Sequence, residues 1–356
     1  EKVEGDRFAY DYEMEVSILD VFAQLRFSFK RWDAFLSAMH TNNDYQRIGK
    51  FQNERFESNS LGNSQKAEFS NTGFKSGFTY RLNGRHSLIL NGAYLKRPPV
   101  LQNTFINPRE NNQVVPDLKD EKIGSADMNY YLRLPKLTGR FTGFYTRFQD
   151  ITDVNFFFVD AGIGSDFVQE VLTGLDKLHI GAELGVTYQL SSAVKLSGVF
   201  SLAKYRYASN PNVSINFDTA DASEELINTV GNVDLGKASL KDYKLAQGPQ
   251  KAWAIGIDYR DPKYWWVALS ANYLGDNYSN ISTITRTSSF YLDPETGENF
   301  PNATRENVNS LLAQKPLDNF YLLNAVAGKS WLLNGKYISV FMSLNNLFNT
   351  RFRTGG

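Results

Sequence analysis

The clearest feature of this sequence is a repeated alternation of large apolar side chains with small or polar ones. From residue 253 to 259 every second position is Trp, Ile or Tyr, and the alternation resumes over 265–273 after a break at Asp261-Pro262. A period of two is typical of a β-strand with two unlike faces, and the short break predicts a tight hairpin. The same pattern recurs along the chain and is most regular between His179 and Leu190.

Short turns divide the alternating runs into hairpins. Counting the runs gives about twelve strands of about ten to fourteen residues, near the 9–11 that a tilted membrane strand needs and longer than most globular strands. Asn-Gly, which occurs at two of the turns, predicts a type I′ turn with positive φ at both positions. The six turns are Lys30-Arg31, Asn83-Gly84, Leu134-Pro135-Lys136, Ser191-Ser192, Asp261-Pro262 and Asn334-Gly335.

The connections at the other ends of the hairpins are long and rich in Asn, Ser, Asp, Gly and Pro. Short turns on one side and long loops on the other are typical of outer-membrane β-barrels. The sequence therefore predicts an all-β fold, a transmembrane antiparallel β-barrel, with a soluble sandwich or propeller as the alternative. The long connections span roughly 46–68, 98–120, 152–177, 208–249 and 276–318.

Aromatic side chains near the short turns give a second indication. Trp32, Trp265 and Trp331 each lie within a few residues of a turn, where a girdle at the membrane–water interface is expected. Val267 and Leu269, on the same face as Trp265, are predicted to face lipid. The opposite face carries many small and polar residues, which suits a wet and crowded lumen.

The amino-acid composition excludes several further functions and kinds of site. The 356 residues carry 38 basic and 38 acidic side chains, so the net charge is zero and gives no footprint for nucleic acid. The chain has no cysteine, which excludes disulfides and thiolate metal sites. No apolar run is long enough for a helical span, but alternating strands never produce one.

Four stretches resemble one family. Residues 338–356, which include Asn346-Leu347-Phe348-Asn349, are similar to the penultimate strand of TonB-dependent outer-membrane receptors, and the Thr-Gly-Gly that follows is typical of the Bacteroidota branch. Residues 95–135 resemble the family's Pro-rich loop and descending strand. Residues 172–190 and 250–275 resemble two further strands, and all four occur in the family's order.

The resemblance implies that residues 1–356 are one part of a single domain, about 12 strands of a 22-stranded barrel. The plug domain, the TonB box and the last strand would then lie in segments that this chain does not include. It implies a receptor in the outer membrane of a Gram-negative bacterium that takes up a small nutrient ligand with energy from TonB. A surface-exposed lipoprotein is a further candidate partner. The alternative is a non-transporting barrel that serves as a structural or assembly component of an outer-membrane complex.

Little in the sequence points to other chemistry. We expect no enzyme and no cofactor, because no nucleophile and base can be selected and no phosphate-binding motif occurs. His40, His86 and His179 show no metal-ligand spacing. The acidic segment 293–299 could bind calcium, but without the EF-hand register a plain turn is the favoured interpretation.

Two groups of residues are candidates for contact with a ligand. Arg97, Asn103, Arg109 and Asn111 belong to the loop around Pro98-Pro99 and could face incoming ligand; the alternative is a rigid loop folded over the lumen. Tyr205 and Tyr207, at the end of a strand beside a long loop, could stack on a ligand or belong to an outer aromatic girdle.

Overall fold

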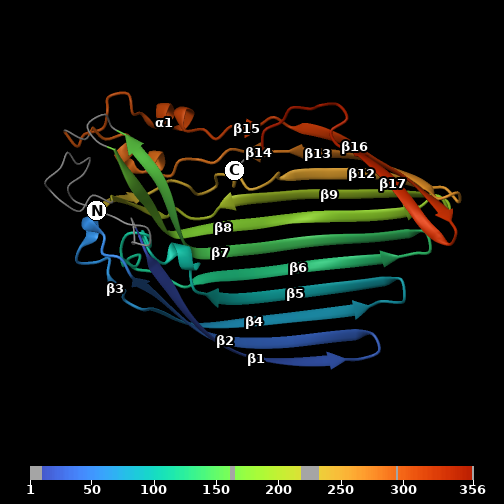
Figure 1. The fold of residues 1–356 in the computed structure, drawn as a ribbon, viewed down its shortest axis with the longest axis horizontal. Helices are drawn as coiled ribbons and strands as arrows, with labels where there is room; N and C mark the ends of the chain where they lie inside the picture. The colour runs from blue at the N-terminus through green and yellow to red at the C-terminus, as the bar shows by residue number, and fades with distance from the viewer. Residues whose placement is uncertain (1–9, 161–164, 218–231, 294–295, 355–356) are drawn as a thin grey trace.

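The computed structural model describes residues 10–160, 165–217, 232–293 and 296–354. Twelve long strands form one antiparallel sheet in which neighbours in the sheet follow chain order (Figure 1), so the predicted all-β, barrel-type fold is confirmed. These strands are β1 (Tyr12–Ser28), β2 (Trp32–Gly49), β4 (Ala67–Arg81), β5 (His86–Arg97), β6 (Glu121–Arg133), β7 (Leu137–Asp160), β8 (Ser165–Gln189), β9 (Val194–Tyr207), β12 (Lys251–Arg260), β13 (Trp265–Gly275), β16 (Phe320–Leu333) and β17 (Lys336–Leu344).

Shorter elements lie in the long connections. The helix α1 (Arg305–Leu311) and four 3₁₀ turns are the helical elements of the described residues, and none is long and apolar enough to cross a membrane. The remaining elements are β3 (Gly62–Asn63), β10 (Asn212–Phe217), β11 (Asn232–Lys237), β14 (Asn277–Tyr278), β15 (Pro316–Leu317), η1 (Glu54–Phe56), η2 (Leu101–Asn103), η3 (Ile284–Arg286) and η4 (Ser288–Phe290).

The six predicted turns all lie at one end of the sheet (Figure 1). Asn334 and Gly335 have φ of 49° and 76°, as the type I′ prediction requires. That prediction is wrong for Asn83-Gly84, where neither residue has positive φ. Here the Asn83 side chain instead accepts hydrogen bonds from the backbone N–H groups of Arg85 and His86, at 2.8 and 3.1 Å, which closes a longer loop.

At the other end, the interpretation of 152–177 as a loop is wrong. β7 and β8 continue through this region for total lengths of 24 and 25 residues, and β10 and β11 add to the extended hairpin. The register shifts between Phe148 and Ile151 and again before Asp153, and Asp150 has φ of 58°. Such a bulge interrupts the two-residue period, which is why the alternation in the sequence does not show the continuing strand.

The sheet has two faces that the pairing register defines across its whole width, because directly paired residues share a face. One row of partners is mostly polar and small, and it includes two buried residues, Asn129 and Thr142: Ser28, Asp33, Thr79, Ile89, Asn129, Thr142, Glu183, Ser201, Ala252 and Leu274. The adjacent row on the other face is mostly apolar and exposed: Phe27, Ala34, Phe78, Leu90, Met128, Gly143, Ala182 and Leu202.

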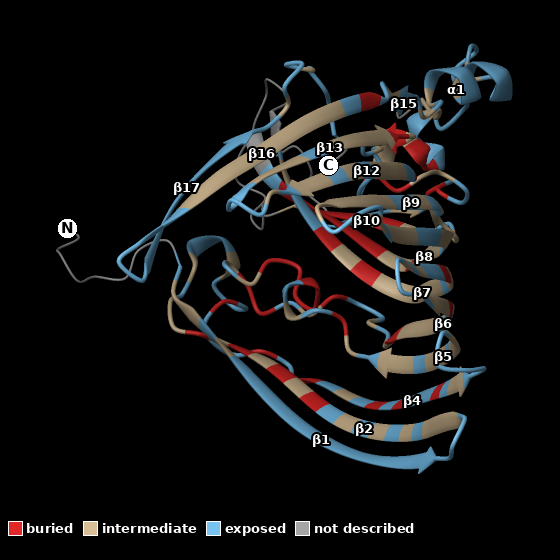
Figure 2. Cartoon of the chain, turned by 90° about the vertical axis from the view of Figure 1, so that its right-hand side faces the viewer, coloured by how far each residue is buried: buried red, intermediate tan, exposed pale blue. Residues whose placement is uncertain are grey.

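The sheet curves into a trough whose concave side receives the long connections (Figure 2). Buried residues concentrate in those connections and in the strand ends beside them, whereas the convex side is exposed. The concave face carries the polar row and is called the inner face; the convex face is called the outer face. The three hydrophobic clusters lie near the loop end, around Leu175, Val171 and Phe105.

Candidate functional site

The inner face carries a connected set of polar side chains on β5, β6 and β7. Asp127 accepts hydrogen bonds from the side-chain amides of Asn91 and Asn129. Arg140 donates to Asn129 Oδ1 at 2.8 Å and to Thr142 Oγ1 at 3.0 Å. Hydrogen-bonded polar groups on a wall of this kind are compatible with water or with another polar surface in the lumen.

Arg47 joins β2 to the two loops that fold onto the inner face. Its side chain is only 1% exposed; Nε donates to the Pro108 carbonyl at 2.6 Å and an Nη donates to the Ser60 carbonyl at 2.8 Å. The same guanidinium donates to the Asn112 side chain and lies 5.2 Å from the Tyr12 ring. A buried cation with several acceptors holds the loops 50–66 and 98–120 in one arrangement.

Of the loop residues that the sequence singled out, Arg97 and Asn103 contact other parts of the protein. Arg97 Nε donates to the buried carboxylate of Glu121 at 2.7 Å while much of its side chain stays exposed. Asn103 is buried; its amide donates to the Thr152 carbonyl at 3.0 Å and accepts from the backbone N–H of Val154. Through these bonds Asn103 anchors the loop on β7.

Arg109 and Asn111 follow in the same loop with opposite surroundings. Arg109 is exposed and its guanidinium lies 5.7 Å from the centre of the Tyr10 ring. Asn111 is buried, and its side-chain oxygen accepts from the backbone N–H of Gln113 at 3.0 Å. Arg109 therefore remains open to a ligand, whereas the buried Asn111 shapes the loop.

Tyr205 and Tyr207 lie on the inner face of β9. Their register partners are His179 and Lys177, and the Tyr205 ring packs edge-on against His179 with centroids 4.9 Å apart. Tyr207 packs against the hydrophobic cluster around Leu175. The outer-girdle interpretation of these two tyrosines does not hold, because a girdle residue must point outward.

The predicted lipid-facing residues lie on the outer face. Trp32 stacks on Phe29 at 4.0 Å, and Trp265 packs against Tyr259 at 5.0 Å, both close to the short turns. Trp331 is exposed on the same face, as is Leu269, and Val267 is the register partner of Tyr259. At the loop end of this face a second aromatic group consists of Trp253, Tyr273 and Tyr321, with centroids 4.9–6.0 Å apart.

A cavity of about 510 Å³ lies among the loops beside α1, and its described lining includes none of the ligand-contact residues that the sequence singled out. Arg286 is 7% exposed, its guanidinium lies 4.6 Å from the Tyr243 ring, and it donates to the carbonyls of Ser282 and Leu312 at 2.7 and 2.9 Å. Its Nε has no hydrogen-bond partner, and no carboxylate lies within ion-pair distance in the described part of the chain. None of the described lining residues is acidic: Ser239, Tyr243, Arg286, Tyr291, Asn299, Ala303, Arg305, Val308, Asn309 and Leu312.

A buried guanidinium with only neutral partners leaves a positive charge uncompensated. Together with Arg305 and two tyrosine rings, Arg286 makes this cavity suitable for a small anionic ligand. The residues that build it come from two long connections, 208–249 and 276–318, so no local motif could have indicated it.

Two of the histidines and the described residues of the acidic segment make contacts that are structural. His86 Nδ1 lies 2.6 Å from the Tyr130 hydroxyl, and His179 sits between the rings of Phe148 and Tyr205. Within the described residues no group of three metal-ligating side chains occurs. In the segment 293–299, Gly297 N–H donates to the Asp293 carbonyl at 2.8 Å, as in a turn; residues 294 and 295 lie outside the described part.

The Asn-Leu-Phe-Asn segment closes a turn after β17. Asn346 and Asn349 have φ of 53° and 49°, a region that Asn tolerates better than most residues. The Asn346 side chain accepts from the N–H of Thr350 and donates to its carbonyl, at 2.9 and 3.0 Å. The positive φ at both positions thus explains why the motif contains two asparagines.

Solved structures with the same fold include three bacterial receptors or transporters. The siderophore receptor PiuA from Acinetobacter baumannii has a TM-score of 0.62 and 13% identity over 97% of this chain and 41% of that one. The copper transporter OprC has a TM-score of 0.60 and 14% identity over 96% and 43%. The ferric-catecholate import receptor Fiu from E. coli K12, in its closed form, has a TM-score of 0.57 and 13% identity over 97% and 42%.

At these identities the likeness is one of fold, and the chain spans 41–43% of the length of these three structures. No match is found among curated proteins. A family model described as TonB dependent receptor-like, beta-barrel, matches residues 4–347, which is nearly the whole chain. The chain therefore belongs to the TonB-dependent receptor-like β-barrel family, whose members are proteins of the Gram-negative outer membrane.

Proposed function

We propose that this chain is part of an outer-membrane receptor that takes up a small nutrient ligand through a plugged barrel with energy from TonB. The family match and the fold shared with a siderophore receptor and a copper transporter support the proposal. The single observation that carries it furthest is the cavity with the buried Arg286, because it offers a ligand-sized space at the loop end of the barrel.

The ligand contacts that we propose follow from the position of each residue in the fold. Arg109 and Arg97 present charged groups from the loop that folds onto the inner face. Tyr205 and Tyr207 lie on the inner wall below, where rings can contact a ligand after it passes the loops. The plug and the segment that contacts TonB are part of the proposal. The role is binding and transport, without catalysis.

The Thr354-Gly355-Gly356 ending after the Asn-Leu-Phe-Asn turn supports a further assignment to the Bacteroidota branch. Residues 355 and 356 lie outside the described part. A surface-exposed lipoprotein is proposed as a partner for the extended β7–β8 hairpin, which exposes Phe156, Phe158 and Phe167. Cross-linking from Phe156 in intact cells would test it, and cross-links to lipid alone would oppose it.

The alternative function is a non-transporting barrel within an outer-membrane complex. The two are separated by comparing three strains: one with the full-length receptor, one with the gene deleted, and one whose receptor lacks only its TonB-contacting segment. Transport predicts that the last two share the same growth defect under nutrient limitation. A TonB-uncoupled receptor that supports normal growth, while the deletion does not, would favour the structural role.

A further inference from the structure

At the loop end, the outer face changes from apolar to basic residues on five strands of the sector from β5 to β12. On β5 the outward apolar run ends at Tyr94 and the next outward residue is Lys96; on β7 the same step goes from Tyr145 to Arg147. The same change from apolar or small residues to basic ones occurs on β6, β9 and β12. Trp253 is followed by Lys251 on β12, Leu202 by Lys204 and Arg206 on β9, and Lys122 on β6 is the register partner of Lys96.

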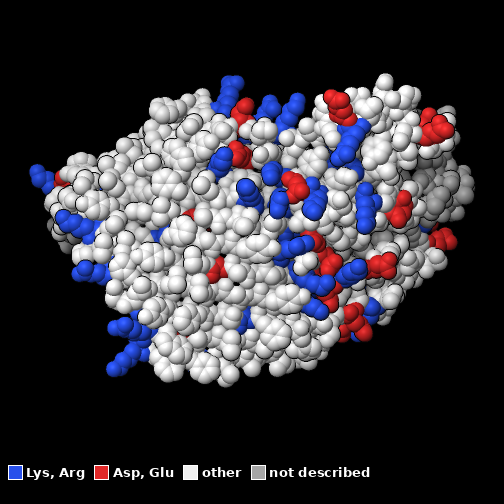
Figure 3. Space-filling view, turned by 180° about the vertical axis from the view of Figure 1, so that it is seen from behind, with Lys and Arg blue, Asp and Glu red and all other residues white. Residues whose placement is uncertain are grey.

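These six outward cations are called the basic belt: Lys96, Lys122, Arg147, Lys204, Arg206 and Lys251. Seen from the convex side, charged side chains gather toward the loop end, while the surface between them and the short turns is mostly uncharged (Figure 3). Aromatic rings followed by cations mark the level where a membrane passes from hydrocarbon to headgroups. This order places the belt where the headgroups of the outer leaflet are expected.

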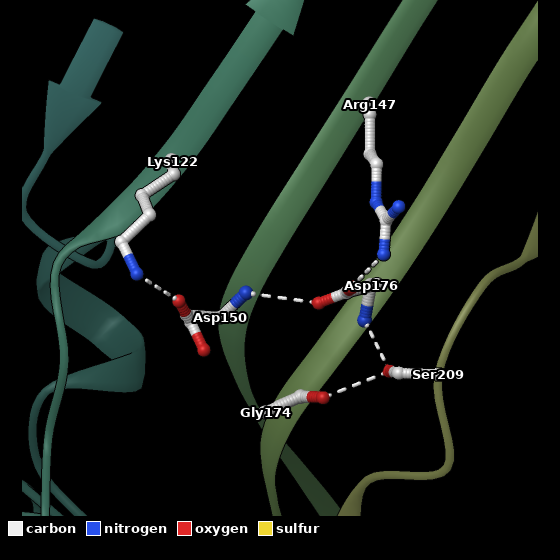
Figure 4. Close-up of polar contacts among 6 residues, drawn as sticks. All are labelled: Lys122, Arg147, Asp150, Gly174, Asp176 and Ser209. Atoms are coloured by element: carbon white, nitrogen blue, oxygen red, sulfur yellow. Dashed lines mark hydrogen bonds and ion pairs between the residues drawn. The ribbon is translucent and has the colours of Figure 1, made fainter.

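Four members of the belt are held in place by aspartates. Lys122 Nζ lies 2.7 Å from Asp150, Arg147 donates to Asp176 at 2.9 Å, and Asp176 also accepts from the backbone N–H of Asp150 at 3.1 Å (Figure 4). Ser209 completes this arrangement by accepting from the Asp176 N–H at 2.7 Å. Arg206 pairs with Asp242 and Lys251 with Asp276.

The charges do not balance, however. Lys96 and Lys204 have no carboxylate within 4.0 Å among the residues that the structure describes. Lys96 and Lys122 are direct cross-strand partners on one face, an arrangement in which like charges destabilise a sheet. Asp150 pairs with Lys122, so Lys96 is the member of this pair that an outside anion would neutralise. The opposite holds on the β2–β4 side, where the acidic residues Asp44 and Glu68 are outward partners and the Lys66 ammonium lies 3.9 Å from the Asp44 carboxylate.

We propose that the basic belt binds the phosphate groups of phosphorylated lipid in the outer leaflet. Lysine ammonium and arginine guanidinium groups both bind phosphate, and their position above the aromatic level sets them at the height of lipid headgroups. The acidic β2–β4 side would repel the same headgroups. Lipid phosphates are therefore expected to order against one sector of the wall, from β5 to β12.

The test measures binding of lipid A to the purified full-length receptor in detergent. Phosphorylated lipid A is compared with the same lipid after its phosphates are removed, and inorganic phosphate is added as a competitor. The test variant is Lys96→Gln with Lys204→Gln, and the charge-preserving variant is Lys96→Arg with Lys204→Arg. Lys66→Gln, outside the belt, is the control. Heat-modifiable migration on gels measures the folded fraction, to which binding is normalised.

The wild type is expected to bind phosphorylated lipid A. The Gln pair should bind it about twentyfold more weakly, because each basic residue at an anionic lipid surface contributes roughly a fivefold factor. The Arg pair and Lys66→Gln should bind as the wild type does. Unchanged affinity in the Gln pair, equal binding of the phosphate-free lipid, or displacement by millimolar inorganic phosphate would each overturn the proposal.

Discussion

Ile257 on β12 and Leu269 on β13 are direct register partners, and their side chains are 43% and 42% exposed on the outer face. The next pair along the same strands is Gly256 and Ser270, which lies on the inner face. A pair of large apolar residues on the outer face is thus followed, one position along, by a pair of small residues on the inner face. An apolar side chain with no protein layer over it is stable only if lipid or another apolar surface covers it.

The buried Arg47 provides a prediction about the loops. Arg47→Met should loosen the loops 50–66 and 98–120, since the carbonyls of Ser60 and Pro108 lose their donors. We expect a cost of about 2–5 kcal/mol in local stability, from buried acceptors left unpaired. Hydrogen exchange in the two loops measures it. Arg109→Met, an exposed change in the same loop, should leave exchange as in the wild type, and equal exchange in both variants would contradict the assigned role.

Glu170 makes the extended β7–β8 hairpin sensitive to pH. Burial raises the pKa of its carboxyl above the ordinary 4.5, and the Asn155 amide, which donates to it at 3.1 Å, offsets this only in part. The raised pKa means that ionised Glu170 destabilises the folded hairpin. This penalty is absent below about 4.5 and grows as the pH rises through the folded-state pKa.

Glu170→Gln should therefore protect the hairpin at pH 7 relative to the wild type, with the difference vanishing near pH 4. Hydrogen exchange over residues 152–176, corrected for the intrinsic rate at each pH, is the measurement. Glu298→Gln, in an exposed loop, serves as the control. A Gln variant that is less protected than the wild type at pH 7 would show that the carboxylate stabilises the hairpin.

The turn after β17 predicts a difference between two adjacent asparagines. Asn346→Ala removes both side-chain bonds to Thr350 and places alanine at φ of 53°, so we expect a loss of about 2–3 kcal/mol. Asn345→Ala changes a residue without these bonds or a positive φ and should cost little. Thermal unfolding of the full-length receptor, followed by heat-modifiable migration, compares them. Equal shifts in Tm would mean that the turn is not held by Asn346.

The sequence was informative where the two-residue period is unbroken. Alternation around Leu269 assigned the two faces of β13 correctly, and the short turns located all six hairpins. It was misleading where backbone geometry changes without a compositional sign. The bulge at Asp150 shifts the period, so the sequence alone predicts a loop where the two strands continue.

Site residues were harder to predict than faces, for a physical reason. A polar loop residue can point to solvent or satisfy buried backbone groups, and nothing local separates exposed Arg109 from buried Asn103. The Arg286–Tyr243 contact joins irregular segments that only the folded loops bring together. Tyr205 could have been assigned to the inner face, since it is an even number of residues from Ser201 and an odd number from Leu202.

The central claim is that the apolar face of this sheet contacts lipid, and one pair of substitutions tests it most directly. Leu269 lies midway between Trp265 and Tyr273 on the outer face, while Ser270 pairs with Asn324 on the inner face. The measurement is the free energy of folding of the full-length receptor into lipid vesicles. Leu269→Arg should cost about 2–4 kcal/mol and Ser270→Arg much less, as expected for a lipid-facing and a lumen-facing position. Equal penalties, or a larger one for Ser270→Arg, would contradict the account.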